Sequence, residues 1–153
     1  MAIPFTGQLL EGEEIKLYRH HIKEYAGTRY TGARESTYYV TSYGRVARQN
    51  KYRKYSKTDA CKWLKITPST HPCGYYYQVR FPWGTSNIHR LVGKLFLPDF
   101  SDDLMVCHRR ETLPAEHINR VVNLFMGTHS DNMIDAHRKG RKQWSNQYGC
   151  ATS

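Results

Sequence analysis

His108, Asn123 and Asn132 are the residues of this chain whose types and spacing could do chemistry, and all of them lie within 106–141. A neutral imidazole such as that of His108 can act as a general base. An amide oxygen such as that of Asn132, with the carboxylate of Asp135 nearby, suits a hard divalent cation. The stretch therefore predicts a general base beside one divalent cation.

Two strands are expected to position the first of these residues. The apolar runs 104–108 and 121–126 predict a pair of strands joined by a long polar loop, and Gly127 ends the second strand. His108 would lie at the end of the first strand, and Asn123 would lie in the second.

A helix is expected to follow directly. Thr128 and Asp131 form a T-x-x-D capping box, which predicts a helix that begins there and runs to about Lys139. Asn132 would lie in its first turn, facing back across the strands, and Asp135 would share that face because it lies three residues on. The predicted order is strand, loop, strand, helix.

The upstream half of the chain reads as β-structure. The segment 38–48 predicts a hairpin around a Ser-Tyr-Gly turn, and 63–67 and 75–81 predict further strands. Apolar and polar residues alternate in 75–81, so one face of that strand can pack. Tyr76 and Arg80 would lie on the other face, where they meet solvent or nucleic acid.

A short amphipathic helix is expected over 88–96, because its apolar residues recur at helical spacing and Pro98 follows. This helix should be structural. His89 and Arg90 at its start could contact a phosphate or serve in capping and packing, and the sequence does not decide between these roles.

The charge of the chain favours a polyanionic partner. The 153 residues carry 23 Lys and Arg against 13 Asp and Glu, a net charge of +10. No apolar run is long enough to span a membrane, and no secretory signal is evident. The sequence predicts a cytosolic protein that acts on nucleic acid and has no membrane partner.

The cysteines do not form a recognisable framework. Cys61, Cys73, Cys107 and Cys150 are scattered and include no C-x-x-C pair, so neither a zinc ribbon nor a set of disulfides is indicated. Reduced thiols in an intracellular protein are expected.

Basic side chains are expected to contact DNA in two blocks and at one isolated position. Interleaved tyrosines in the first block are typical of a surface that follows a phosphate backbone, although a solvated loop is the alternative. The expected DNA contacts are Arg45, Arg48, Lys51, Arg53, Lys54, Lys57, Arg80, Arg138, Lys139, Arg141 and Lys142.

The stretch 106–141 resembles the HNH (ββα-metal) nuclease module of small phage and intron-encoded homing endonucleases. The resemblance rests on Cys107-His108, on NLFMGT from Asn123, on DNMID from Asp131 and on the KGR step from Lys139. Residue types and spacing agree together over these motifs.

Upstream motifs extend the resemblance to 38–141. YYVTSYGRVAR at 38–48 resembles the Y-x-V-S-x-x-G-R-V motif that precedes HNH modules in this group. GYYYQVRF at 74–81 and NIHRLVGKLFLPDF at 87–100 resemble the family's G-Y-x-x-V strand and V-H-R-L-V-A-x-x-F helix.

The resemblance implies a role for each site residue. His108 would be the general base that takes a proton from the attacking water, and Asn132 would bind the metal. Asn123 would join them in the catalytic set as the residue that braces the loop and orients the imidazole. The implied ion is Mg2+, with Mn2+ or another divalent ion as alternatives, and the products would carry a 5′ phosphate and a 3′ hydroxyl.

The chain departs from the family pattern at Cys107, where many members have Asp or Asn on the metal side. A soft thiol is a poor ligand for Mg2+, so water, Asp131 or Asp135 would complete the coordination. The loop 110–119 has no Cys, which disfavours a structural zinc. Glu111, Glu116 and His117 in this loop are further candidates for contacts that the sequence does not rank.

The sequence thus predicts an α+β protein with an N-terminal antiparallel sheet region and a short helix over 1–100. A ββα-metal module over 101–142 would follow, and then a flexible C-terminal tail over 143–153 that begins directly after the basic residues Arg141 and Lys142. The expected function is metal-dependent cleavage of double-stranded DNA in the cytoplasm of a phage-infected host. The alternatives are a weak or inactive HNH-like DNA-binding protein and an RNA-binding accessory protein. Oligomeric state stays open, a homodimer included.

Overall fold

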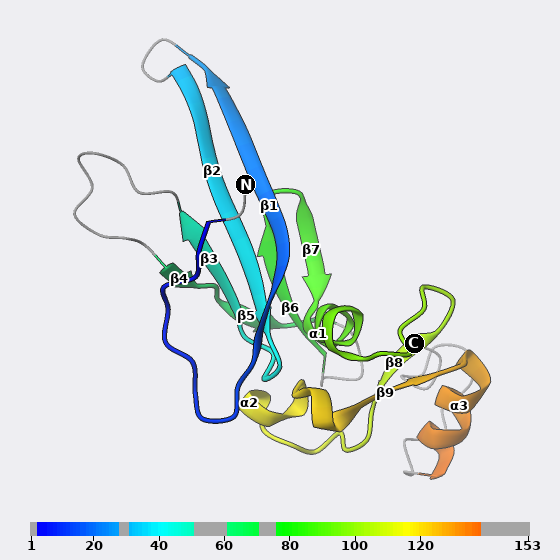
Figure 1. Ribbon diagram of the computed structural model, residues 1–153. Helices are drawn as coiled ribbons and strands as arrows, with labels where there is room; N and C mark the ends of the chain where they lie inside the picture. The colour runs from blue at the N-terminus through cyan, green and yellow to red at the C-terminus, as the bar shows by residue number, and fades with distance from the viewer. Residues whose placement is uncertain (1–2, 28–30, 51–60, 71–75, 139–153) are drawn as a thin grey trace.

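The computed structural model describes residues 3–27, 31–50, 61–70 and 76–138. These residues form antiparallel sheets with a few mostly short helices, so the α+β class expected from the sequence is confirmed (Figure 1). No helix among them is long and apolar enough to cross a membrane.

The first sheet has the strand order β1-β2-β3-β4. Its strands are β1 (Ile15–Ala26), β2 (Thr31–Thr41), β3 (Val46–Asn50) and β4 (Cys61–Trp63). The long β1 and β2 extend beyond the rest of the sheet as a two-stranded ribbon (Figure 1). The predicted hairpin is present as β2 and β3, and Gly44 takes a φ of 84° in the turn between them, a conformation that favours glycine.

The second sheet has the order β5-β6-β7 and consists of β5 (Ile66–Pro68), β6 (Tyr77–Phe81) and β7 (Gly84–Asn87). The single strand predicted over 63–67 is wrong, because β4 pairs with β3 whereas β5 pairs with β6. The alternation predicted for 75–81 holds in β6, since Val79 and Phe81 are buried and Arg80 is exposed. Tyr75 lies outside the described residues.

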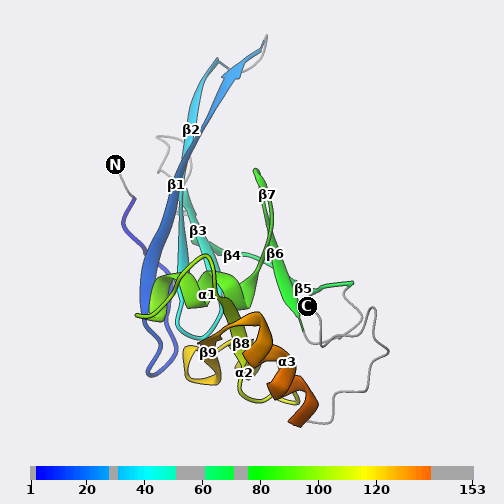
Figure 2. The same cartoon turned by 90° about the vertical axis from the view of Figure 1, so that its right-hand side faces the viewer.

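The predicted amphipathic helix is α1 (Ile88–Phe96), and it lies between the sheets and the C-terminal hairpin (Figure 2). Its apolar stripe, including Leu91 and Val92, is buried in the core. Gly93 permits close approach to the next strand, because a Cβ atom there would lie 2.6 Å from Cγ2 of Val106. The helix is therefore held tightly against the strand that carries His108.

The C-terminal elements are β8 (Met105–His108), α2 (Ala115–Ile118), the 3-10 helix η1 (Val121–Asn123), β9 (Leu124–Gly127) and α3 (His129–Arg138). The strand predicted over 121–126 is wrong at its start, because η1 occupies its first residues and β9 begins only at Leu124. Long-range hydrogen bonding explains the difference, since the backbone N of Val121 donates to Ser42 O at 2.9 Å instead of pairing with β8.

The capping box predicted at the start of α3 is present. The backbone N of Asp131 donates to Oγ1 of Thr128, and the backbone N of Thr128 donates to Oδ2 of Asp131, both at 3.0 Å. These bonds satisfy donors that a helix start leaves unpaired. The predicted end at Lys139 falls outside the described residues.

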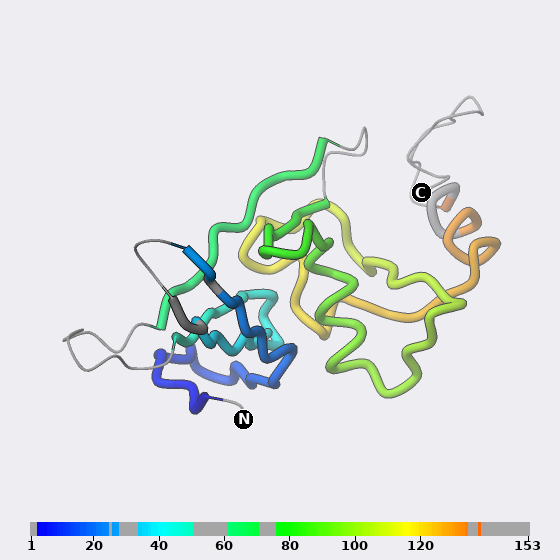
Figure 3. Tube along the Cα trace, turned by 90° about the horizontal axis from the view of Figure 1, so that it is seen from above, coloured from blue at the N-terminus to red at the C-terminus, as the bar shows by residue number. Residues whose placement is uncertain are grey.

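One hydrophobic core joins the parts of the chain on either side of residue 100. Tyr38, Val79 and Ile88 belong to the same buried cluster as Val106 and Leu124. Viewed from above, the first sheet and α3 lie on opposite sides of the molecule (Figure 3). The hairpin that carries His108 is thus packed on the upstream sheets through α1.

Candidate functional site

His108 is buried at the end of β8, where it pairs with Leu124 of β9. Its Nε2 lies 2.9 Å from Oδ1 of Asn119. A carbonyl oxygen can only accept a hydrogen bond, so Nε2 of the neutral ring carries the hydrogen and Nδ1 carries the lone pair. If Nδ1 is the atom that accepts the proton, His108 must be in this tautomer to act as a general base.

Asn119 is a site residue that the sequence did not single out. It is buried, and it lies in the loop between β8 and β9, one residue beyond α2. The β2–β3 turn supports it from behind, because a Cβ atom on Gly44 would lie 2.9 Å from Cβ of Asn119. The only signal in the sequence is an asparagine placed among the polar residues of the loop, which does not reveal burial.

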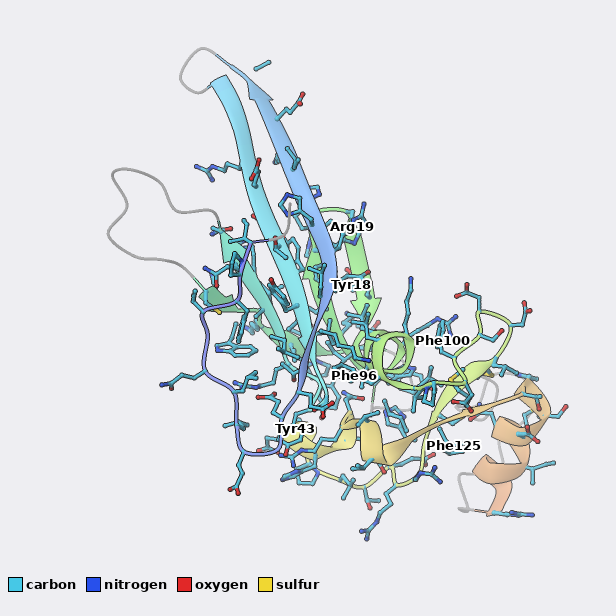
Figure 4. The ribbon with its side chains drawn as sticks, in the orientation of Figure 1. Tyr18, Arg19, Tyr43, Phe96, Phe100 and Phe125 are labelled. Atoms are coloured by element: carbon cyan, nitrogen blue, oxygen red, sulfur yellow. The ribbon has the colours of Figure 1, made fainter. Side chains whose placement is uncertain are left out.

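The same turn holds the residue after Asn119. The guanidinium of Arg120 lies over the ring of Tyr43 at 3.8 Å, and Tyr43 lies next to α2 (Figure 4). The turn of the upstream sheet is therefore part of the support of the loop that holds His108.

Asn123 uses its whole amide on the backbone of the loop. Its Oδ1 accepts from the N of Arg110 at 2.9 Å, and its Nδ2 donates to the O of Arg110 at 2.9 Å and to the O of Ile118 at 2.8 Å. Both ends of the segment that carries Asn119 are tied together in this way. The geometry is that of a bracing residue, which acts on His108 through Asn119.

Asn132 and Cys107 line the same cavity as His108, a hollow of about 270 Å3. Asn132 is buried in the first turn of α3, as predicted, and its backbone N donates to Thr128 O at 3.0 Å. Cys107 is also buried, with its Sγ 3.8 Å from the O of Met105. The fold thus brings together three of the residues predicted for the site.

The acidic residues predicted as possible metal ligands are Asp131 and Asp135. Asp131 lines a separate open hollow with Arg109, Phe125 and Arg138, and its carboxylate is bonded in the capping box. The hydrogen bonds from Thr128 hold the pKa of Asp131 below its usual value. Asp131 is therefore a helix cap, and it does not line the cavity of His108. The side chain of Asp135 lies outside the described residues.

The oxygen donors at the cavity suit a hard cation. Glu111 and Asn132 both line the cavity. Their side chains, a carboxylate and an amide, carry the kind of oxygen ligand that a hard cation prefers. No cluster of three or more His, Cys, Asp or Glu side chains that could hold a metal occurs within the described part of the chain. An ion in the cavity would depend on oxygen ligands from water and from a bound phosphate as well.

His89 and Tyr76, which the sequence left open as possible contacts to nucleic acid but did not place beside His108, lie next to its ring. The ring centroid of His89 lies 5.0 Å from that of His108, and Tyr76 stacks on both, at 4.9 Å and 6.1 Å respectively. Burial, with smaller effects from His108 and Arg90, lowers the pKa of His89 to about 3. His89 is therefore a neutral imidazole at physiological pH.

The basic residues predicted to contact DNA are only partly available. Arg45 lies 3.8 Å over Trp63 and donates from Nε to Glu13 at 2.9 Å, so its guanidinium is engaged within the fold. Arg48 is half-buried, whereas Arg80 and Arg138 are exposed. The remaining predicted contacts fall outside the described residues, and these are Lys51, Arg53, Lys54, Lys57, Lys139, Arg141 and Lys142.

Of the comparisons with known proteins, only the comparison with solved structures finds a similarity. No protein-family model matches the chain, and no curated protein does. Among solved structures, the chain is similar to the HNH homing endonuclease I-HmuI, from a study of its DNA binding and cleavage. The two are 23% identical with a TM-score of 0.48, and the match covers 81% of this chain and 62% of that one.

Proposed function

We propose that this protein is a divalent-metal-dependent DNA endonuclease of the HNH type, with His108 as its general base. One observation carries the proposal: His108, held as the Nε2–H tautomer by Asn119, lines the same cavity as Asn132. The surrounding elements follow in the order β8, β9, α3, which is the order of a ββα module. The net charge of +10 favours a nucleic acid as the substrate.

Each residue of the chain has a distinct part in the proposed reaction. Nδ1 of His108 takes a proton from the water that attacks the phosphorus atom. Asn119 accepts a hydrogen bond from Nε2–H and so stabilises the imidazolium that forms. Asn123 keeps Asn119 in place by holding both ends of the loop.

Asn132 would hold the divalent cation through its amide oxygen, with Glu111 as a second oxygen donor at the cavity. When bound, such an ion supplies positive charge next to the scissile phosphate and the 3′ leaving oxygen. Mg2+ is the ion proposed, and Mn2+ is the alternative. The sulfur of Cys107 is left out of the proposed ligand set because a thiol suits softer metals.

The proposal is tested by nicking of supercoiled plasmid DNA in Mg2+ and in Mn2+. His108→Ala should lower the rate by about 100-fold or more, because general bases contribute on the order of 10²–10⁴. His117→Ala is the matched control, since His117 is an exposed histidine of α2 that does not line the cavity. Equal rates for wild type and His108→Ala would contradict the proposal.

A DNA-binding protein without cleavage is the second candidate, and Cys107 favours it. Cys107 is buried at the cavity directly before His108, where an oxygen ligand would serve a hard cation better. This candidate expects salt-dependent DNA binding with no nicked plasmid in any divalent ion. A competition experiment between duplex DNA and single-stranded RNA distinguishes the nuclease and the DNA-binding protein, which prefer duplex DNA, from an RNA-binding protein.

A further inference from the structure

The N-terminal turn of α1 faces the cavity that contains His108 and Asn132. Asn87, His89 and Arg90, which form this end of the helix, all line the cavity. Asn87 is the N-cap residue but makes no side-chain cap hydrogen bond within the described part of the chain, and the first turn has no acidic residue. The backbone N–H groups of a helix start carry partial positive charge, so this end attracts an anion.

His89 provides an independent observation at the same place. Its side chain is only 7% exposed, and its Nδ1 is buried with no hydrogen-bond partner among the described residues. Burying a polar atom without a partner opposes folding. A phenylalanine would fill similar space without that cost, so the packing with Tyr76 accounts for a ring at this position but not for its nitrogens.

Arg90 adds charge beside His89. Its NH1 lies 3.4 Å from the O of Leu104, and its NH2 lies 3.7 Å from Asp102, an exposed carboxylate. These contacts tie the guanidinium to the segment that leads into β8. A fixed positive charge therefore lies next to a neutral imidazole at the same helix end.

We propose that His89 and the N-terminal turn of α1 bind a non-bridging oxygen of the scissile phosphodiester in the cavity that His108 and Asn132 also line. His89 contributes a neutral N–H donor, and Arg90 contributes positive charge. The inference deepens the proposed nuclease function, on which the identity of the anion rests. The anion site itself rests on the helix end and on His89.

The first test compares two replacements of His89 in the plasmid nicking assay. His89→Phe keeps a ring against Tyr76 and His108 but removes the donor, and His89→Gln keeps a neutral N–H donor without the ring. His89→Phe should lower kcat by about 100- to 1,000-fold, on the scale of a lost donor to a charged reacting oxygen. KM should change by less than about threefold, because the net charge of +10 supplies most of the attraction to DNA.

The two replacements distinguish the donor from the packing. Recovery of most of kcat in His89→Gln supports the proposal. Wild-type kcat in His89→Phe overturns it, and so does a His89→Gln protein that is folded and as slow as His89→Phe. Thermal unfolding of each variant shows whether the fold is retained.

The second test does not depend on cleavage. The full chain with His108→Ala is titrated with inorganic phosphate at constant ionic strength, and backbone ¹H–¹⁵N resonances are followed. Saturable shifts at Ile88, His89 and Arg90, weakened by adding His89→Phe, support the anion site. Absence of shifts at these residues overturns it. Phosphate binding without cleavage by wild type would refute the proposed nuclease and leave the anion site standing.

Discussion

Replacement of Asn119 by alanine probes the hydrogen bond that sets the tautomer of His108. Both residues are buried, and Nε2 and Oδ1 lie 2.9 Å apart. Loss of the acceptor leaves a buried N–H unpaired, which costs about 1–3 kcal/mol of folding free energy. Urea denaturation should show a loss of stability in this range.

The effect on catalysis has a separate magnitude. A hydrogen bond to a charged group contributes about 1.5–3 kcal/mol, against about 0.5–1.5 kcal/mol for a neutral pair. Asn119 therefore stabilises the imidazolium of His108 over the neutral ring by about 1 kcal/mol, or about fivefold in rate. Loss of the preferred tautomer adds to this, so kcat for plasmid nicking should fall by about tenfold or more.

Two controls and one spectroscopic measurement sharpen the test of Asn119. Asn119→Asp keeps an acceptor oxygen and should recover most of kcat, whereas Val122→Ala changes an exposed residue of the same loop and should have no effect. Long-range ¹H–¹⁵N spectra of the imidazole should show the Nε2–H tautomer of His108 in wild type and a mixture in Asn119→Ala. An unchanged tautomer together with kcat within about twofold of wild type would refute the reasoning.

Three further predictions concern the scaffold and its pH dependence. Gly93→Ala should destabilise the fold by about 1–2 kcal/mol in urea, because the new Cβ would lie 2.6 Å from Cγ2 of Val106. A contact this short should cost about 2–3 kcal/mol, the upper part of the range for overpacking, and the gain in helix propensity returns about 1 kcal/mol. Stability equal to wild type would contradict the close packing. Burial raises the pKa of Glu13, but hydrogen bonds, chiefly from Arg45, outweigh it and leave the pKa below 4.5. The folded state therefore gains stability above pH 4.5 and loses it as pH falls further, and Glu13→Gln should flatten that loss in urea titrations between pH 3 and 5. His89 has a folded pKa of about 3 against 6.5 when unfolded, so the unfolded chain binds the extra proton and stability falls as pH drops from 6.5 toward 3. His89→Phe should lose less stability than wild type over that window, and an equal loss in both proteins would show that His89 is not buried as a neutral ring.

The basic side chains show what composition alone can and cannot predict. A net charge of +10 predicts attraction to a polyanion. It does not show which basic side chains are free to contact that polyanion, because a buried carboxylate elsewhere in the chain can form an ion pair with one of them. Arg45 is bound to Glu13, which lies 32 residues away in the sequence, and is stacked on Trp63. Only the folded chain shows that this cation belongs to the scaffold.

Asn132 and Asp131 show what spacing in the sequence can and cannot predict within the site. Spacing on a strand and on a helix predicted that His108 and Asn132 face one another, and both line one cavity. The sequence offered Asp131 both as the partner of Thr128 in the capping box and as a residue to complete the metal coordination, and in the structure its carboxylate caps α3 and lines a different hollow. Local hydrogen bonding decided the direction of that side chain.

The sequence by itself determined the elements whose signals are local. The hairpin of β2 and β3, the helix α1 and the capping box of α3 follow from turn residues, apolar periodicity and side-chain to backbone bonds between near neighbours. Tertiary structure decided which distant side chains meet, because a loop takes its path from partners far along the chain. Asn119 reaches His108 only because Asn123 ties its loop and the β2–β3 turn supports it from behind. His89 joins the same site because Gly93 lets α1 approach β8.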